Sequence, residues 1–178
     1  MKIIKNSLFI LLLSISVKAD IVSDFLKKNY KAICNYSNIQ KFSKNEKALS
    51  IIGVSCIKTD NLYLLPYIVK GLKRTDYGRK NGIYFLTIYM QKKLLYSYMF
   101  DRIKLENFNF PMTDYVLSKI FDAIKNKKYR LFGDKYIIKD NTKAYHLYKE
   151  GDKMFVDTYE NGKLIKRRWY RWSNNKLD

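Results

Sequence analysis

The chain has 178 residues, a formal net charge of +19 and a hydrophobic fraction of 47%, with only seven glycines and two prolines. This much apolar surface with so little Gly and Pro predicts a folded protein and excludes a disordered tail. The single histidine excludes two-histidine acid–base chemistry and multi-histidine zinc sites. We expect no catalytic residues, no metal and no cofactor. An exported enzyme or toxin with dispersed catalytic carboxylates is the alternative.

Residues 1–19 have the pattern of a cleaved secretory signal. Lys2 and Lys5 precede a short apolar run at residues 8–17. Val17 and Ala19 place an aliphatic residue at position −3 and a small residue at position −1 of a cleavage site after Ala19. A membrane-spanning helix needs about 20 apolar residues, roughly twice the length of this run. We therefore predict an exported protein, periplasmic or secreted, that begins at Asp20 and is soluble or peripheral to the membrane.

The two cysteines, Cys34 and Cys56, both lie in the predicted mature chain. A small, even number of cysteines in an exported protein predicts a disulfide. A metal site would need more ligands than two cysteines and one histidine supply. We predict one disulfide, which should stabilise the fold by about 3 kcal/mol through the loop it closes.

The charge is spread evenly along most of the chain. Basic and acidic residues number 18 and 9 in residues 20–126, and 14 and 7 in residues 127–178. Most of the charge is therefore background composition, and only the stretch from Lys163 onward departs from it. Because an exported chain rarely meets nucleic acid, we expect no nucleic-acid partner. Envelope proteins, anionic glycans and lipids remain as partners.

Residues 20–126 are predicted to form a helical domain. Apolar residues at helical spacing predict a first helix, and the capping box Ser43-Lys44-Asn45-Glu46 predicts the start of a second. Pro66 suits the first turn of a third helical segment. The apolar stripes of the first two helices contain Leu26, Tyr30, Ile33 and Cys34, and Leu49, Ile52 and Cys56.

Two further helices are predicted in the second half of this domain. One is a central helix that is apolar nearly all round, although Ile, Thr and Tyr at residues 83–90 leave a strand as a competing interpretation. The other starts near Thr113. Their expected buried faces are Ile83, Leu86, Met90, Leu94 and Tyr98 in the first, and Leu117, Ile120, Phe121 and Ile124 in the second.

Residues 127–178 change to short β-type runs separated by turn residues, among them Gly133-Asp134 and Asn161-Gly162. They predict an antiparallel meander of four or five strands, packed on the helical part, and hence an α+β fold. The stretch "TYENGKLIKRRWY" resembles one unit of the short Tyr/Asn-Gly hairpin repeats found in some antitoxin-like and surface proteins. No function follows from a single unit.

Two features outside the last strand are further candidates for a functional role. His146 falls within a predicted strand, and we interpret it as a sheet residue among tyrosines. Arg74, Arg79 and Lys80 surround a glycine-containing loop before the apolar helix, which predicts either a solvated loop or an anion-binding helix start.

The last predicted strand combines cations and aromatic rings at a density that the rest of the chain lacks. Alternation along the strand places Arg167, Trp169 and Arg171 on one face, and Arg168, Tyr170 and Trp172 on the other. We expect one tryptophan in the core and the other at a protein interface, because Trp and Arg dominate interface hot spots. This predicts a non-catalytic binding or scaffold protein of the cell envelope, in a secretion, motility or envelope-maintenance assembly. Binding of anionic glycan or lipid is the alternative.

Overall fold

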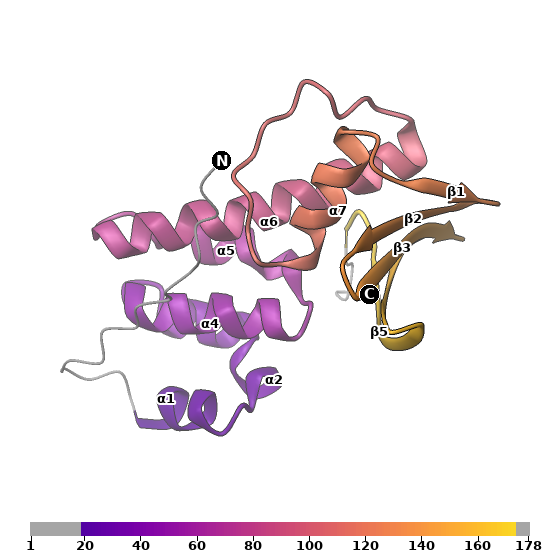
Figure 1. Ribbon diagram of the computed structural model, residues 1–178. Coiled ribbons are helices and arrows are strands. Elements are labelled where there is room, and N and C mark those ends of the chain that lie inside the picture. The colour runs from indigo at the N-terminus through magenta and orange to yellow at the C-terminus, as the bar shows by residue number, and fades with distance from the viewer. Residues whose placement is uncertain (1–18, 174–178) are drawn as a thin grey trace. The chain divides into compact units, whose positions relative to one another are not determined.

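The computed structural model describes residues 19–173 (Figure 1). The predicted signal segment, residues 1–19, therefore lies almost wholly outside the described residues. Within them, seven α-helices and a short 3-10 helix precede a five-stranded antiparallel sheet, which confirms the α+β fold. The described residues divide into two compact units, residues 19–89 and residues 90–173.

The first unit is entirely helical. Its elements are α1 (Ala19–Leu26), α2 (Tyr30–Ile33), α3 (Tyr36–Lys41), α4 (Glu46–Lys58), the 3-10 helix Leu62–Leu64, α5 (Leu65–Val69) and the first half of α6 (Asp76–Asp101). The prediction of one first helix through Cys34 is wrong, because Lys28 adopts a left-handed φ of 60° and ends it. Leu26, expected on the buried stripe, is 70% exposed. Pro66 does lie in the first turn of α5, as predicted.

Asn45 caps α4, not Ser43. The side chain of Asn45 accepts a hydrogen bond from the Ala48 backbone N–H at 3.1 Å. The predicted capping box is therefore wrong, and Glu46 is free to turn toward another segment. The cap shows that Asn serves as well as Ser at this position, because both offer a side-chain oxygen to an unpaired N–H.

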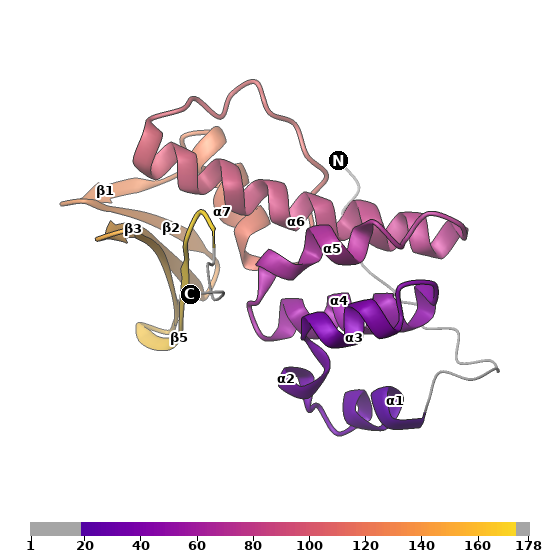
Figure 2. The same ribbon diagram turned by 180° about the vertical axis from the view of Figure 1, so that it is seen from behind.

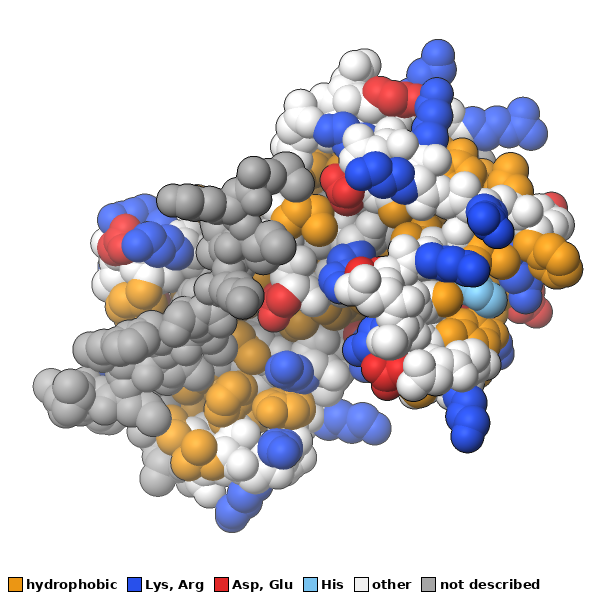
Figure 3. All heavy atoms as spheres, in the orientation of Figure 1, with side chains coloured by type: hydrophobic (Ala, Val, Ile, Leu, Met, Phe, Trp, Pro, Cys, Tyr) orange, Lys and Arg blue, Asp and Glu red, His pale blue; other side chains and the backbone are white. Residues whose placement is uncertain are grey.

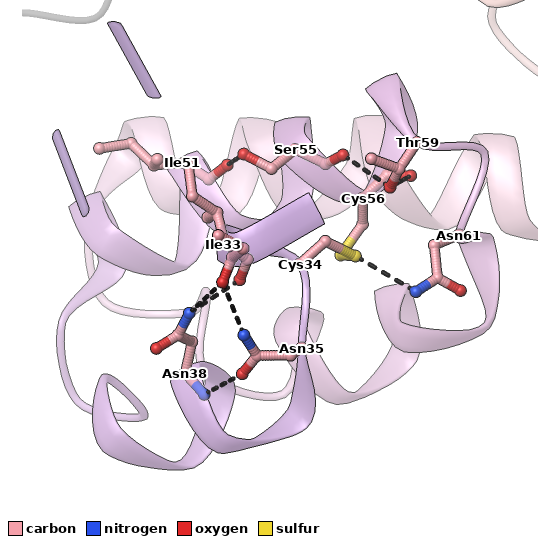
Figure 4. Close-up of a disulfide and its surroundings, with 10 residues drawn as sticks. Ile33, Cys34, Asn35, Asn38, Ile51, Ser55, Cys56, Thr59 and Asn61 are labelled. Atoms are coloured by element: carbon pink, nitrogen blue, oxygen red, sulfur yellow. Dashed lines mark hydrogen bonds between the residues drawn. A yellow bond between two sulfur atoms is a disulfide. The ribbon is translucent and has the colours of Figure 1, made fainter. Parts of the chain in front are cut away.

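The predicted disulfide between Cys34 and Cys56 is confirmed (Figure 4). It joins the end of α2 to the buried face of α4 with a Cα–Cα distance of 4.9 Å. The chain around it is held by side-chain amides. Asn35 and Asn38 donate to the carbonyl oxygens of the preceding turn, and Asn61 donates to the Cys34 sulfur at 3.4 Å. The bond thus fixes α2 against α4.

Residues 83–90 are helical, as part of α6, which removes the competing strand interpretation. The buried face of α6, however, differs from the predicted one, since Ile83, Leu86 and Met90 are exposed. The buried face reads Phe85, Ile88, Lys92, Leu95 and Met99, at alternating spacings of three and four residues. Lys92 interrupts this stripe. A prediction based on apolar residues alone therefore selects the adjacent, more exposed stripe of the helix.

The second unit contains the end of α6, α7 (Val116–Lys125) and the sheet. The strands are β1 (Arg130–Phe132), β2 (Lys135–Asp140), β3 (Lys143–Glu150), β4 (Lys153–Glu160) and β5 (Lys163–Tyr170), and they neighbour one another in chain order. The predicted buried face of α7, with Leu117, Ile120 and Phe121, is confirmed. Helix α7 lies beside the sheet in both views (Figures 1 and 2).

One face of the sheet, called the inner face here, packs against the helices of its own unit. Tyr170 on β5 shares a 2.8 Å hydrogen bond with the hydroxyl of Tyr115, directly before α7. Lys119 on α7 pairs with Asp140 on β2. The buried side chains of the inner face are Ile138, Tyr145, Leu147, Met154, Val156, Thr158 and Tyr170.

Candidate functional site on the outer face of the sheet

The opposite face, called the outer face here, carries two rows of side chains that cross the strands. The registers of the five strands align them. The first, the aromatic row, is Phe132, Lys135, Tyr148, Phe155 and Trp169. The second, the polar row, is Arg130, Ile137, His146, Asp157 and Arg167. With strands about 4.8 Å apart, each row is about 19 Å long.

Ring stacking and cations order the aromatic row. The rings of Tyr148 and Phe155 stack at 5.2 Å with 9° between their planes. The ammonium group of Lys135 lies 4.6 Å from the centre of the Tyr148 ring, and that of Lys153 lies 4.9 Å from the centre of the Trp169 ring. Such contacts stabilise an exposed site by about 0.5–1 kcal/mol each. Tyr148 is only 7% exposed, whereas Trp169 is 44% exposed, so the row presents mainly the Trp169 ring together with positive charge.

A buried carboxylate, Asp157, holds the polar row. Arg167 donates from Nε and Nη2 to the two oxygens of Asp157, each at 2.8 Å, and the Tyr148 hydroxyl donates to Oδ2 at 3.2 Å. Asp157 is only 1% exposed, whereas the Arg167 side chain is half exposed. A two-pronged charged bond of this kind fixes the guanidinium plane. Asp157 thus sets the positions of both Arg167 and Tyr148.

The electrostatics of this cluster keep Asp157 ionised. Burial alone would raise the pKa of Asp157, but the hydrogen bonds and positive charge of Arg167 outweigh it, and the pKa lies below its usual value. The pKa of Arg167 is raised by the same pair. Burial raises the pKa of Tyr148, and the Asp157 charge adds to that shift. The row carries one fixed ion pair at neutral pH.

His146 lies on β3 between these groups, with its ring 4.3 Å from the ring of Tyr159. Tyr159 belongs to the adjacent strand β4, which agrees with the interpretation of His146 as a sheet residue among tyrosines. Burial lowers the pKa of His146 and outweighs the opposing effect of the Asp157 charge. In Figure 3 the histidine, in pale blue, lies among hydrophobic side chains in orange, with Lys and Arg side chains in blue nearby.

The structure divides the predicted partner-binding residues between the two faces. Arg167 and Trp169 lie on the outer face, and Trp169 is 44% exposed. Arg168 and Tyr170 lie on the inner face. Arg168 donates to the Thr158 hydroxyl at 3.1 Å, and Tyr170 is 3% exposed. Four of the six predicted residues therefore alternate along β5, and two of them reach the outer face.

The last two predicted residues follow the end of β5. Arg171 pairs with Asp152 at 2.7 Å and lies near the Trp169 ring. Trp172, 48% exposed, packs against α6, where the ammonium group of Lys93 lies 3.7 Å from its ring centre. The expectation that one tryptophan belongs to the core is wrong, because Tyr170 takes that position. Trp172 attaches the chain to α6, and Trp169 alone faces outward from the strand.

Lys92 is a buried cation next to this attachment. It is 2% exposed and donates to the Trp172 carbonyl oxygen at 3.3 Å. Burial, helped by the neighbouring charge of Lys93, lowers the pKa of Lys92 to about 8. The lysine therefore costs the fold some stability at neutral pH, while its hydrogen bond holds the chain end.

The predicted anion site at Arg74, Arg79 and Lys80 lies at the start of α6. There the carboxylate of Glu46 accepts hydrogen bonds from the backbone N–H groups of Lys73, Arg74 and Thr75. Burial would raise the pKa of Glu46, but these bonds and that of the Thr75 hydroxyl lower it to about 2. An internal carboxylate thus occupies the backbone donors at this helix start.

The cations of that predicted site are engaged locally. Lys80 pairs with Asp76 at 2.8 Å, and Arg79 donates to the Arg74 carbonyl oxygen at 2.9 Å. Gly78 lies against Glu46, since a Cβ on this glycine would come within 2.4 Å of the carboxylate. The absence of a side chain at Gly78 permits this close approach, which lets Glu46 join the starts of α4 and α6.

Other kinds of site have little support in the described residues. No group of three or more His, Cys, Asp or Glu side chains among residues 19–173 is arranged to hold a metal ion. In the same range, no helix has the length and apolar character needed to cross a membrane. A depression of about 220 Å³ lies beside Tyr98, Tyr129 and Tyr136, with lysines and an arginine at its rim.

No protein-family model, no curated protein and no solved structure matches this chain.

The sequence reasoning found Trp169 and Arg167 but missed Tyr148, Phe155 and Asp157. Alternation along "KMFVDTYE" already puts Phe155 and Asp157 on one face of a strand. What it lacked was the pairing of that strand with the next one. The pairing depends on a β-bulge in β5 that has no signature in the sequence.

Proposed function

We propose that the chain is an exported, non-catalytic binding or scaffold protein of the cell envelope, and that its outer face docks an acidic surface of a protein partner. The observation that carries this proposal is the aromatic row, in which Trp169 and the stacked pair Tyr148–Phe155 lie between lysines. Trp, Tyr and Arg are the residues that most often supply the binding energy of protein interfaces.

The cations over the rings favour an acidic protein surface over a neutral sugar. A sugar that stacks on a ring needs the ring face uncovered. Lys135 and Lys153 lie over the rings of Tyr148 and Trp169. Carboxylates of a partner can contact these ammonium groups without displacing them. Charge complementarity of this kind speeds association and sets specificity.

The size and rigidity of the outer face also suit a protein partner. Rows about 19 Å long across five strands match the dimensions of a standard interface, which buries about 800 Å² on each partner. The Asp157–Arg167 pair and the stacked rings are already ordered in the described chain. Pre-ordered side chains lose less conformational entropy when a complex forms.

Export rests on the sequence pattern of residues 1–19 and is supported by the disulfide, which is compatible with an oxidising compartment. The proposed setting is a secretion, motility or envelope-maintenance assembly. N-terminal sequencing of protein from its native host should find Asp20 as the first residue. Recovery of a chain that retains Met1 in an integral membrane fraction would contradict export.

Photo-crosslinking tests the binding surface. A photoreactive phenylalanine derivative in place of Trp169 should trap a defined protein in the native envelope. The same group in place of Trp172, which is equally exposed but packs on α6, is the matched control and should trap little. Equal trapping from both positions would contradict the assignment of the outer face.

Salt dependence then separates a protein partner from the alternative ligands. Binding to an anionic glycan or lipid through charge alone should collapse in high salt. A complex anchored by Trp169 and the stacked rings should slow its association in salt but persist once formed. If irradiation in high salt traps no protein, the glycan or lipid alternative is favoured.

A further inference from the structure

The hairpin of β1 and β2 ends in two strongly exposed apolar side chains. Leu131 is 62% exposed and Phe132 is 75% exposed. They directly precede the turn at Gly133 and Asp134, where Gly133 has a left-handed φ of 54°. Since exposed Leu and Phe side chains gain free energy when they leave water, a pair at a hairpin tip indicates a contact surface.

The two side chains point to opposite faces of the sheet. Phe132 pairs with Lys135 and lies on the outer face, whereas Leu131 pairs with Tyr136 and lies on the inner face. A partner that docks on the outer face can cover Phe132 but not Leu131. A deformable apolar layer that the hairpin tip enters covers both side chains together.

The charges around the tip identify that layer as anionic. Lys127, Lys128, Arg130 and Lys135 flank the two apolar residues, and Asp134 is the only acid between them. Apolar side chains next to lysines and arginines bind the boundary between the headgroups and acyl chains of anionic bilayers. Each such cation near the surface adds to the attraction.

We propose that the tip of this hairpin, residues 130–135, docks the protein on the surface of an anionic lipid bilayer. The tip shares Arg130, Phe132 and Lys135 with the outer face, but Leu131 lies outside that face, so substitution of Leu131 tests the membrane contact separately from partner docking.

The depth of insertion is limited by two features of the tip. β1 is an edge strand, so the backbone groups on its open edge need water or headgroups as hydrogen-bond partners. Asp134 in the turn repels anionic phosphates. The apolar side chains therefore enter only the headgroup boundary, and the protein remains peripheral to the bilayer.

Vesicle co-sedimentation tests this proposal with the mature chain. We expect binding to vesicles that contain phosphatidylglycerol and little binding to vesicles of phosphatidylcholine alone. Leu131→Ser should weaken binding to the anionic vesicles about tenfold, because it removes an apolar side chain from the lipid boundary. Leu131 is exposed, so the thermal unfolding midpoint of this variant should not change. Asp134→Asn should strengthen binding a few-fold, since it removes the only acid at the tip.

Two comparisons keep this result distinct from partner docking. Trp169→Ala should leave vesicle binding unchanged, and Leu131→Ser should leave photo-crosslinking from the outer face unchanged. Equal binding to neutral and anionic vesicles, or binding that survives Leu131→Ser, would overturn the membrane assignment. Loss of the trapped protein partner in Leu131→Ser, with vesicle binding intact, would show instead that the tip contacts that protein.

Discussion

The two faces of the same sheet differ in character although their residues alternate along the same strands. The inner face carries buried side chains such as Leu147 and Val156 that pack within the unit, and its one prominent hydroxyl pair joins Tyr170 to Tyr115. The outer face carries rings with cations over them and a buried carboxylate that fixes an arginine. The inner face holds the sheet on its helices, and the outer face is the surface that we propose for partner binding.

A single β-bulge decides which residues of β5 reach each face. Beyond the Asn161-Gly162 turn, Tyr159 pairs with Leu164, but Thr158 pairs with Lys166, so Ile165 has no partner. A regular hairpin would instead pair Asp157 with Lys166 and turn Tyr170 outward. Because one inserted residue reverses the alternation, the bulge places Trp169 outside and Tyr170 inside.

Insertion of one alanine between Lys166 and Arg167 should have the largest effect. It shifts the rest of β5 by one position and turns Arg167 and Trp169 toward the helices, where no buried acid would pair with the arginine. An unpaired buried charge is strongly destabilising, so we expect a loss of more than about 4 kcal/mol in the free energy of unfolding. Urea unfolding measures it. Deletion of Ile165, which removes the unpaired residue but keeps the pairs from Thr158–Lys166 to Met154–Tyr170, is the control and should cost much less. Comparable losses in both variants would contradict the role given to the register.

Neighbouring substitutions on β5 give the next contrast. Tyr170→Ala should lower the free energy of unfolding by about 3–5 kcal/mol, because it leaves a cavity on the inner face and removes the hydrogen bond to the Tyr115 hydroxyl. Trp169→Ala should cost less than about 1 kcal/mol, because its ring is half exposed. Chemical unfolding of both variants checks the pair. Similar costs at the two positions would remove the distinction between the faces.

Lys92 is a buried cation of α6 and contrasts with the cations of the outer face, which contact solvent. Its folded-state pKa of about 8 lies below the ordinary 10.5, so the unfolded chain binds the proton more tightly. Stability should therefore rise between about pH 8 and 10.5. Lys92→Met should stabilise the chain by about 2 kcal/mol at pH 7 and flatten this rise. A free energy of unfolding that falls between about pH 8 and 10.5 would contradict the lowered pKa of Lys92.

Asp157→Asn should have a smaller effect, of about 1–2 kcal/mol, since Arg167 is half exposed and regains water. The folded-state pKa of Asp157 is lowered, so its contribution is complete above the unfolded pKa of about 3.9 and is lost as the pH falls through the folded value. The asparagine variant should lack this acid-side loss. Unfolding curves of the unchanged chain and of Asp157→Asn, each at neutral and acid pH, measure this difference.

The sequence predicted the elements of this fold better than their faces. Turn residues such as Asn161-Gly162 marked the strands, and the spacing of the apolar residues marked α4, α6 and α7. The buried face of α6 was missed because Lys92 interrupts it. The alternation along β5 was predicted correctly, but the neighbours of Arg167 and Trp169 on the outer face were missed, because the bulge that sets the strand pairing has no sequence signature. Local patterns fix elements, whereas faces depend on which side chains the tertiary structure can bury.

The most direct test of the outer face compares the two tryptophans in binding. They are 44% and 48% exposed, but Trp169 belongs to the aromatic row and Trp172 packs on α6. With the partner trapped from position 169, calorimetric titration should show that Trp169→Ala weakens association by about 2 kcal/mol, or roughly thirtyfold. Trp172→Ala should leave the affinity within about threefold of the unchanged chain. Equal weakening by both variants, or weakening by Trp172→Ala alone, would contradict the claim that the outer face is the binding surface.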